Sequence, residues 1–153
     1  MEGIEDKLGA MGLALPEAAA PLAAYVPFVR AGDLLHVSGQ ISRDGGGVIR
    51  GTLGQDMDAE AGASAAQTCG LALLAQVKVA CEGDWDRLLR VVKLTGFVAS
   101  APGFFDQPKV VNGASELMAN LLGDCGQHAR SAVGVSALPL GAAVEVEGVF
   151  LLR

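Results

Sequence analysis

The sequence is poor in cysteine and in aromatic residues. It contains 3 cysteines, and aromatic residues make up 5% of its 153 positions. Cys69, Cys81 and Cys125 are an odd number without CxxC spacing, so they predict neither a disulfide framework nor a metal site. We therefore expect reduced, buried thiols and a cytoplasmic protein. Glycine is abundant at 21 residues, which favours closely packed layers over bulky aromatic clusters.

Basic charge and long apolar runs are also scarce. The chain has 11 lysines and arginines against 17 acidic residues, a net charge of −6. Such a chain lacks the electrostatic footprint of a nucleic-acid-binding protein. No apolar run approaches the roughly 20 residues of a membrane span. The N-terminus is acidic where a secretion signal would be basic. We expect neither a membrane nor a nucleic-acid partner.

The composition fits one globular domain. Apolar residues make up 51% of the chain and charged residues 18%, which argues against disorder. We expect an N-terminal extension over residues 1–22, with a short helix over Glu2–Met11 and an Ala/Pro-rich connector that follows Gly12 and reaches Pro21. Residues 23–153 are then expected to form the single domain.

Hydrophobic periodicity predicts the element order ββ, α, β, α, ββ. This order is typical of an α+β domain in which two long helices cover one face of a mainly antiparallel sheet. Gly32 is expected in a hairpin turn, residues 44–47 in a flexible loop, and Asp56 or Asp58 at a helix N-cap. The predicted strands are Val26–Arg30, Leu34–Gly39, Leu88–Ser100, Ser131–Ala137 and Ala143–Leu152, and the predicted helices are Ala59–Cys81 and Phe104–Leu122.

The last two predicted strands carry the most informative charges. If they pair as a hairpin with their valines together, Gly134 lies opposite Glu145 and the small residues of the first strand face Glu145 and Glu147. Arg130 shares that face but lies about 13 Å along the strand from Gly134. A second chain would then be needed to bring Arg130 to Glu145. Taken by themselves, a surface arginine and a solvated strand face are the simpler interpretation.

Three motifs in this order resemble the Rid family of reactive-intermediate (enamine/imine) deaminases, also called YjgF or L-PSP proteins. The resemblance covers roughly Tyr25 to Leu152, and its last motif is the most specific. The motifs are Leu34-Leu-His-Val-Ser-Gly-Gln40, Val91-Val-Lys-Leu-Thr-Gly-Phe-Val98, and Ala129-Arg130-Ser131 followed by Leu138-Pro139 and Val144-Glu-Val-Glu147.

The resemblance implies a chorismate mutase-like fold and a homotrimer whose sheets form a central barrel, with sites in the clefts between subunits. It implies that Arg130 binds a substrate carboxylate and that Glu145 positions or activates water. It also implies that Tyr25 lines the site and that Ser38, Gly39 and Asn112 contribute contacts. The sequence departs from the family pattern around Tyr25 and at His128 and Ala132.

The expected activity is hydrolytic deamination of small 2-imino or 2-enamino acids to 2-oxo acids and ammonia. Arginine presents a planar fork of donors that matches a carboxylate. The substrate already hydrolyses readily, so the protein need only orient it and direct a water, without metal or cofactor. Two alternatives stay open. The cleft could bind or sense a carboxylate metabolite without turnover, or the chain could be an endoribonuclease, although its acidity and lack of paired histidines argue against RNA cleavage.

Two histidines complete the set of candidate groups. His128 lies close to Arg130 in the sequence and is interpreted as a turn residue, with proton transfer near the site as the alternative. His36 alternates with apolar neighbours and is expected to be a structural strand residue.

Overall fold

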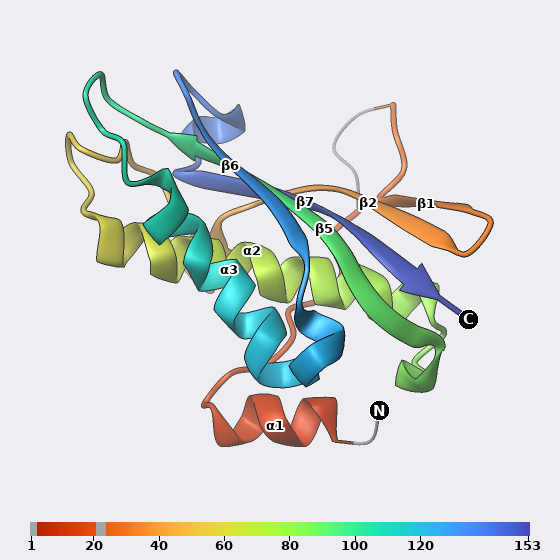
Figure 1. Cartoon of the computed structure of the whole chain (residues 1–153). Helices are drawn as coiled ribbons and strands as arrows, with labels where there is room; N and C mark the ends of the chain where they lie inside the picture. Colours follow the sequence, from red (N-terminus) through yellow and green to blue (C-terminus); the bar gives the residue numbers. More distant parts are fainter. Residues whose placement is uncertain (1–2, 21–23) are drawn as a thin grey trace.

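A five-stranded sheet forms one layer of the protein, with two long helices packed on one of its faces (Figure 1). The computed structural model describes residues 3–20 and 24–153. Strand order is β1-β2-β7-β5-β6, and every pairing is antiparallel except β5 with β6. This confirms the predicted α+β fold. The strands are β1 (Phe28–Ala31), β2 (Leu34–Ile41), β5 (Leu88–Ala99), β6 (Ala129–Val135) and β7 (Val144–Leu152), and the helices are α1 (Ile4–Ala10), α2 (Ala59–Ala80) and α3 (Gln107–Leu122).

Small residues bring the two long helices into close contact. A side chain at Gly113 of α3 would overlap the backbone carbonyl of Ala63 in α2, so only glycine fits there. Helix α2 begins at the predicted cap, because the Asp58 carboxylate accepts a hydrogen bond from the Ala61 amide at 2.8 Å. Helix α3 begins at Gln107, three residues later than predicted, with Pro108 in its first turn, where proline is well tolerated.

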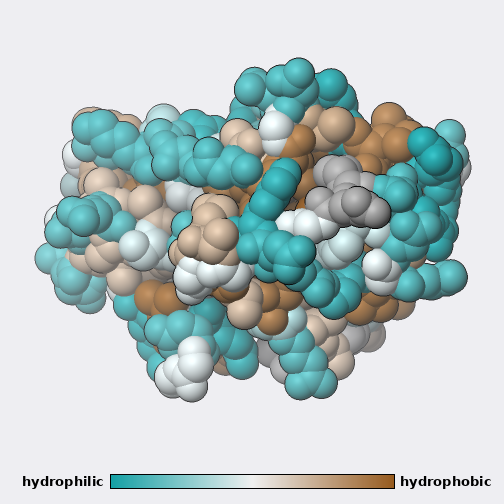
Figure 2. Space-filling model, turned by 90° about the horizontal axis from the view of Figure 1, so that it is seen from below, coloured by the Kyte–Doolittle hydropathy of each residue, from teal (hydrophilic) through white to brown (hydrophobic). Residues whose placement is uncertain are grey.

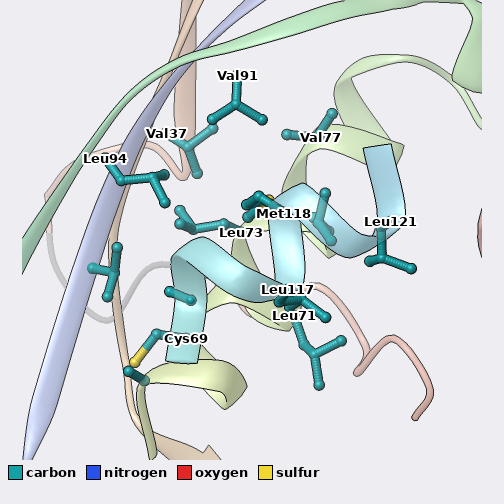
Figure 3. Close-up of a cluster of buried hydrophobic side chains, with 14 of the residues drawn as sticks. Val37, Cys69, Leu71, Leu73, Val77, Val91, Leu94, Leu117, Met118 and Leu121 are labelled. Atoms are coloured by element: carbon teal, nitrogen blue, oxygen red, sulfur yellow. The ribbon is translucent and has the colours of Figure 1, made fainter. Parts of the chain in front are cut away.

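The core fills the space between the sheet and the helices (Figure 3). Side chains from β2, β5 and β7 meet the buried faces of α2 and α3. The apolar face of α3 is buried along its length, at Val110, Val111, Ala114, Leu117, Met118 and Leu121. Cys69 and Cys81 are buried among them, and burial raises the pKa of both thiols. Figure 3 labels Val37, Cys69, Leu71, Leu73, Val77, Val91, Leu94, Leu117, Met118 and Leu121.

The N-terminal segment takes part in this core. Ile4 and Leu8 of α1 are each 1% exposed, and α1 lies below the two long helices (Figure 1). Further along, the buried Gln76 side chain donates a hydrogen bond to the Ala19 carbonyl at 2.8 Å, which fixes the segment against α2. The predicted boundary between residues 22 and 23, and the end of the predicted connector at Pro21, lie outside the described residues.

Two predicted turns have different outcomes. The β1–β2 hairpin turns at Gly32, which has φ +61° as predicted for a tight turn. Residues 44–47, predicted to be a flexible loop, instead form the closed end of a short hairpin between β3 (Arg43–Asp44) and β4 (Gly47–Val48), in which Asp44 pairs with Gly47. The Asp44 carboxylate accepts a hydrogen bond from the Gly46 amide at 2.8 Å, a local bond that orders the turn.

The predicted pairing of the last two strands is wrong. Strand β5 lies between β6 and β7 and pairs with both, so Gly134 does not oppose Glu145. Helix α3 connects β5 to β6, and a helical crossover of this kind joins parallel neighbours. The chain then crosses to the far side of β5 through residues 136–143, a connection that looks like a hairpin loop in the sequence.

No helix in residues 3–20 and 24–153 combines the length and the apolar content that crossing a bilayer requires.

Candidate functional site

An irregularity in β2 lies next to the Glu145 carboxylate. The pairing of β2 with β7 shifts register between Val37 and Gln40, which is the signature of a β-bulge over Ser38 and Gly39. A side chain at Gly39 would overlap the Glu145 carboxylate. Glycine at this position therefore leaves the room that the Glu145 side chain occupies.

Ser38 ties the preceding segment to the same bulge. Its amide donates to the Pro27 carbonyl at 2.9 Å, and its hydroxyl donates to the Val26 carbonyl at 2.8 Å. Tyr25, which is 51% exposed, lies directly before these two residues and lines the same cleft as Ser38, Gly39 and Glu145. The structure therefore gathers four of the six predicted site residues in one place.

The Glu145 carboxyl is half-buried, and its environment disfavours its charged form. Burial raises the pKa of Glu145 above its ordinary value of 4.5, and the negative charge of Glu147 raises the pKa further. A carboxyl group with a raised pKa can accept and return a proton closer to neutral pH than an exposed one.

The cleft that these residues line has a volume of about 850 Å³. One wall comes from the N-terminal segment, a second from α2, and a third from the turn at Leu140. The face seen from below shows apolar surface in separate patches framed by hydrophilic side chains (Figure 2). The lining is largely apolar, and its polar members include the charged residues Glu17, Arg43 and Asp44 as well as Tyr25, Ser38 and Glu145.

Arg130 lies elsewhere, on the edge strand β6 beside α3. One guanidinium nitrogen, Nη1, donates to Asn112 Oδ1 at 2.8 Å and to Ser115 Oγ at 3.2 Å, and Nη2 lies 3.4 Å from the Pro108 carbonyl. Within residues 3–20 and 24–153, no carboxylate lies within 4.0 Å of Arg130. Neutral acceptors thus orient the guanidinium while its positive charge stays uncompensated, as an anion-binding group requires.

His128 extends this network one step further. Its Nε2 atom lies 2.9 Å from Ser115 Oγ, and its Nδ1 atom lies 2.6 Å from the Gly126 carbonyl. Because a carbonyl only accepts, Nδ1 carries the proton and, in the neutral ring, Nε2 accepts from the Ser115 hydroxyl. His128 is therefore a hydrogen-bonded residue behind Arg130, and both interpretations made from the sequence, turn residue and proton-transfer group, stay predictions. His36 is an exposed strand residue.

Arg130 and Glu145 belong to opposite faces of the sheet, which corrects the predicted shared face. Arg130 pairs with Leu94, which is fully buried against the helices. Glu145 pairs with Phe97, an odd number of residues from Leu94 along the same regular stretch of β5, and so points to the other face. One chain therefore carries two separate parts of the predicted site, which we call half-sites. One contains Arg130 and Asn112, and the other contains Glu145 and the cleft.

Ser115 and Leu140 were not predicted from the sequence. Ser115 lies three residues after Asn112, and this helical spacing places both side chains beside one partner. That spacing was the available signal, but it has meaning only once Arg130 is known to face α3. Leu140 carried no signal of its own, because its place at the cleft depends on a turn that the sequence does not specify.

Replacing Glu145 with glutamine should stabilise the protein increasingly as the pH rises. The pKa of Glu145 is higher in the folded chain than its ordinary 4.5, so its stabilising contribution is present below that value and is lost as the pH rises through the folded pKa. Glu145→Gln removes this loss. In thermal melts between pH 4 and pH 8, the variant's Tm should rise relative to wild type with pH, whereas Glu116→Gln on the exposed side of α3 should show no such trend. If the Tm of the variant relative to wild type fell as the pH rose, the raised pKa of Glu145 would be contradicted.

Comparisons with known proteins identify the family of this chain. The profile of the YjgF/chorismate mutase-like endoribonuclease family matches residues 5–150. Protein TCP17 from Trypanosoma cruzi is 48% identical over 152 residues, which covers 98% of this chain and 94% of that protein. The crystal structure of a protein of unknown function from Agrobacterium tumefaciens has a TM-score of 0.92 at 45% identity, covering 98% of this chain and 92% of that one. RidA from an Antarctic Psychrobacter has a TM-score of 0.59 at 25% identity, covering 90% and 94%.

The chain belongs to the YjgF/chorismate mutase-like family, the group that its three motifs resemble. Within that family, its geometry is closer to the Agrobacterium protein than to the Psychrobacter RidA.

Proposed function

We propose that this protein hydrolyses reactive 2-imino and 2-enamino acids to 2-oxo acids and ammonia, at sites completed by two chains of a homotrimer. The observation that carries the proposal is the division of the predicted residues into two half-sites. An uncompensated, oriented guanidinium lies at one edge of the sheet, and a half-buried carboxyl lies in a cleft on the other side of β5. The reaction needs both a carboxylate clamp and a group that handles protons, and on this proposal Arg130 and Glu145 supply them from different half-sites.

Arg130 is suited to hold the substrate carboxylate. Asn112 and Ser115 fix Nη1 from one side, which leaves Nε and part of Nη2 to meet a carboxylate with two parallel hydrogen bonds. Clamping the carboxylate fixes the neighbouring imine carbon, so one rigid contact orients the reacting bond. Asn112 then acts on the substrate through Arg130.

Glu145 is suited to move the protons. A 2-enamino acid first tautomerises to the imine, as an N–H proton is lost and a proton is gained by the β-carbon. The Glu145 carboxylate then takes a proton from water as the water oxygen bonds to the imine carbon, and returns that proton to the imine nitrogen to give a carbinolamine. The hydroxyl proton then passes through Glu145 to the nitrogen, the C–N bond breaks, and ammonia leaves as the C=O bond forms. Both protons of the water end on nitrogen, so the step balances as a hydrolysis and calls for no metal or cofactor. The raised pKa of Glu145 suits both proton transfers.

A trimer is supported by the face of the sheet that the helices leave open. Phe97, Val149 and Leu151 lie on it and are only partly buried, and Val133 is 43% exposed. Packing three such faces together would bury this apolar surface, and the proposal requires that β6 of one chain then lies near β2 and β7 of the next. The cytoplasmic location remains a prediction.

The assay is ammonia release from freshly generated 2-iminopropanoate and 2-iminobutanoate. Wild type should exceed the uncatalysed rate, and Glu145→Gln should lose about 100-fold in kcat/KM, because general acid–base catalysis contributes about 10²–10⁴-fold. Glu116→Gln, on the exposed side of α3, is the matched control and should stay within about threefold of wild type. A wild-type rate equal to the uncatalysed one would refute deamination.

Binding without turnover is the second candidate, and the uncompensated charge of Arg130 supports it as well. It predicts saturable binding of a 2-oxo acid that Arg130→Ala abolishes, with no release of ammonia from any imine.

Endoribonuclease activity is named in the family description. The net charge of −6 opposes binding to a polyanion, so we do not propose it for this chain.

A further inference from the structure

We propose that the cleft beside Glu145 receives a large apolar side chain of the substrate, and that Leu140 selects for it. The substrates would then be imines of branched or aromatic amino acids, in preference to those of alanine. This inference rests on the function proposed above and adds the substrate class.

The size of the cleft is the first argument. Its volume of about 850 Å³ lies within the 300–1,000 Å³ range of sites for ligands far larger than a three-carbon acid. Glu145 lines it, so a substrate whose imine carbon lies at that carboxyl would direct its side chain into the remaining space. A methyl group would leave most of that space to water.

The chemistry of the walls is the second argument. Leu13 and Leu15 of the N-terminal segment and Leu71 and Ala72 of α2 line the cleft. The segment is held in place, because the buried Gln76 amide donates to the Ala19 carbonyl at 2.8 Å. A fixed apolar wall rewards a large apolar side chain, by roughly fourfold in affinity for each methylene group removed from water.

Leu140 is the third argument, since its backbone is in an unfavourable conformation. It has φ +57° and ψ +16°, in the left-handed region that leucine rarely adopts. Arg50 Nε donates to the Leu140 carbonyl at 2.8 Å and holds this turn. The side chain is nevertheless 52% exposed at the cleft, where it contributes little to the core. Strain of this kind persists where a side chain has a task, and here the task is apolar contact with a ligand.

The variant Leu140→Gly tests the apolar contact with the ligand without destabilising the fold. Glycine accepts φ +57° without strain, so the variant should melt no lower than wild type and should lose only the apolar contact. Glu82→Gly is the matched control, because Glu82 also has positive φ, at +56°, and does not line the cleft. Ala72→Phe is a second variant that fills the cleft from α2.

The experiment compares kcat/KM for 2-imino-4-methylpentanoate and 2-iminopropanoate, each generated in situ from leucine or alanine. Wild type and Glu82→Gly should prefer the larger imine by at least about tenfold, as three methylene-sized groups in a half-open cleft imply. Leu140→Gly and Ala72→Phe should each lower that ratio by about threefold or more. Equal rates for the two imines in wild type, or an unchanged ratio in both variants, would overturn the inference and leave the deaminase proposal standing.

If wild type hydrolyses neither imine, deamination fails, and binding decides the inference separately. Calorimetry would then compare 4-methyl-2-oxopentanoate with pyruvate. Preferential binding of the larger acid by wild type, reduced in Leu140→Gly but not in Glu82→Gly, supports the apolar cleft. Equal affinities for both acids, or no binding of either, overturn it.

Discussion

Replacing Arg130 with lysine should lower kcat/KM for a 2-imino acid by at least about 100-fold, nearly as much as replacement with alanine. Lysine keeps the charge but offers a single point donor, so it cannot reproduce the two parallel bonds to a carboxylate. It also cannot span from Asn112 Oδ1 to Ser115 Oγ while still meeting a ligand. Misplacing the substrate by about 1 Å is enough for a loss of this size.

The matched control is Arg90→Lys. Arg90 is an exposed residue of β5 whose Nη1 donates to the Gln127 carbonyl at 3.4 Å, so its replacement should leave kcat/KM within about twofold of wild type. Ammonia release and thermal melts measured together separate a catalytic loss from unfolding. If Arg130→Lys retained wild-type kcat/KM, Arg130 would have no clamp role, whatever its surroundings.

The contacts of Arg130 also predict a smaller loss of kcat/KM for Ser115→Ala. Ser115→Ala removes one of the two acceptors of Nη1 and the link to His128, but leaves Asn112 in place. Its effect should therefore be smaller than that of Arg130→Lys, because a neutral hydrogen bond contributes only about 0.5–1.5 kcal/mol.

Much of the fold could be predicted because its signals are local. The β1–β2 hairpin follows from a glycine at a two-residue turn, and α2 follows from Asp58 and the small-residue period behind it. The failure at β6 and β7 has a different origin. Strand pairing is a long-range property, and the alternation of Val133 and Val135 fits a pairing with either β5 or β7. A short connection suggested a hairpin, whereas the helical crossover of α3 had already placed β6 beside β5.

The candidate site was likewise hard to predict wherever it depends on long-range contacts. Tyr25, Ser38 and Gly39 line the same cleft as Glu145, and a bulge in β2 brings the Gly39 backbone close to the Glu145 carboxyl. A Ser-Gly pair within a predicted strand is a weak signal for such a bulge. Arg130 was predicted as the key residue, but its face could not be predicted while β6 had the wrong neighbour. The walls of the cleft come from three distant segments, so neither its size nor the role of Leu140 is visible before the chain is folded.

Mixing two inactive variants should restore activity, which is the second large effect expected. Arg130→Ala lacks the clamp and Glu145→Gln lacks the proton carrier, and each should be close to the uncatalysed rate alone. The half-sites lie on opposite faces of the sheet in one chain, so a complete site needs Arg130 of one chain and Glu145 of the next. In oligomers assembled from equal amounts of both variants, each intact half-site comes from half of the chains, so about a quarter of the sites should be complete.

The measurement that tests this account most directly is the ammonia release of those mixed oligomers, made by co-expression with two different tags and purified by both in turn. Every trimer that carries both tags contains both variants and therefore one complete site of three, so we predict that activity rises from near the uncatalysed rate to roughly a third of wild type. Mixing Arg130→Ala with the double variant Arg130→Ala/Glu145→Gln provides the control and should restore nothing. Mixed oligomers no more active than their two parents would contradict a site shared between chains.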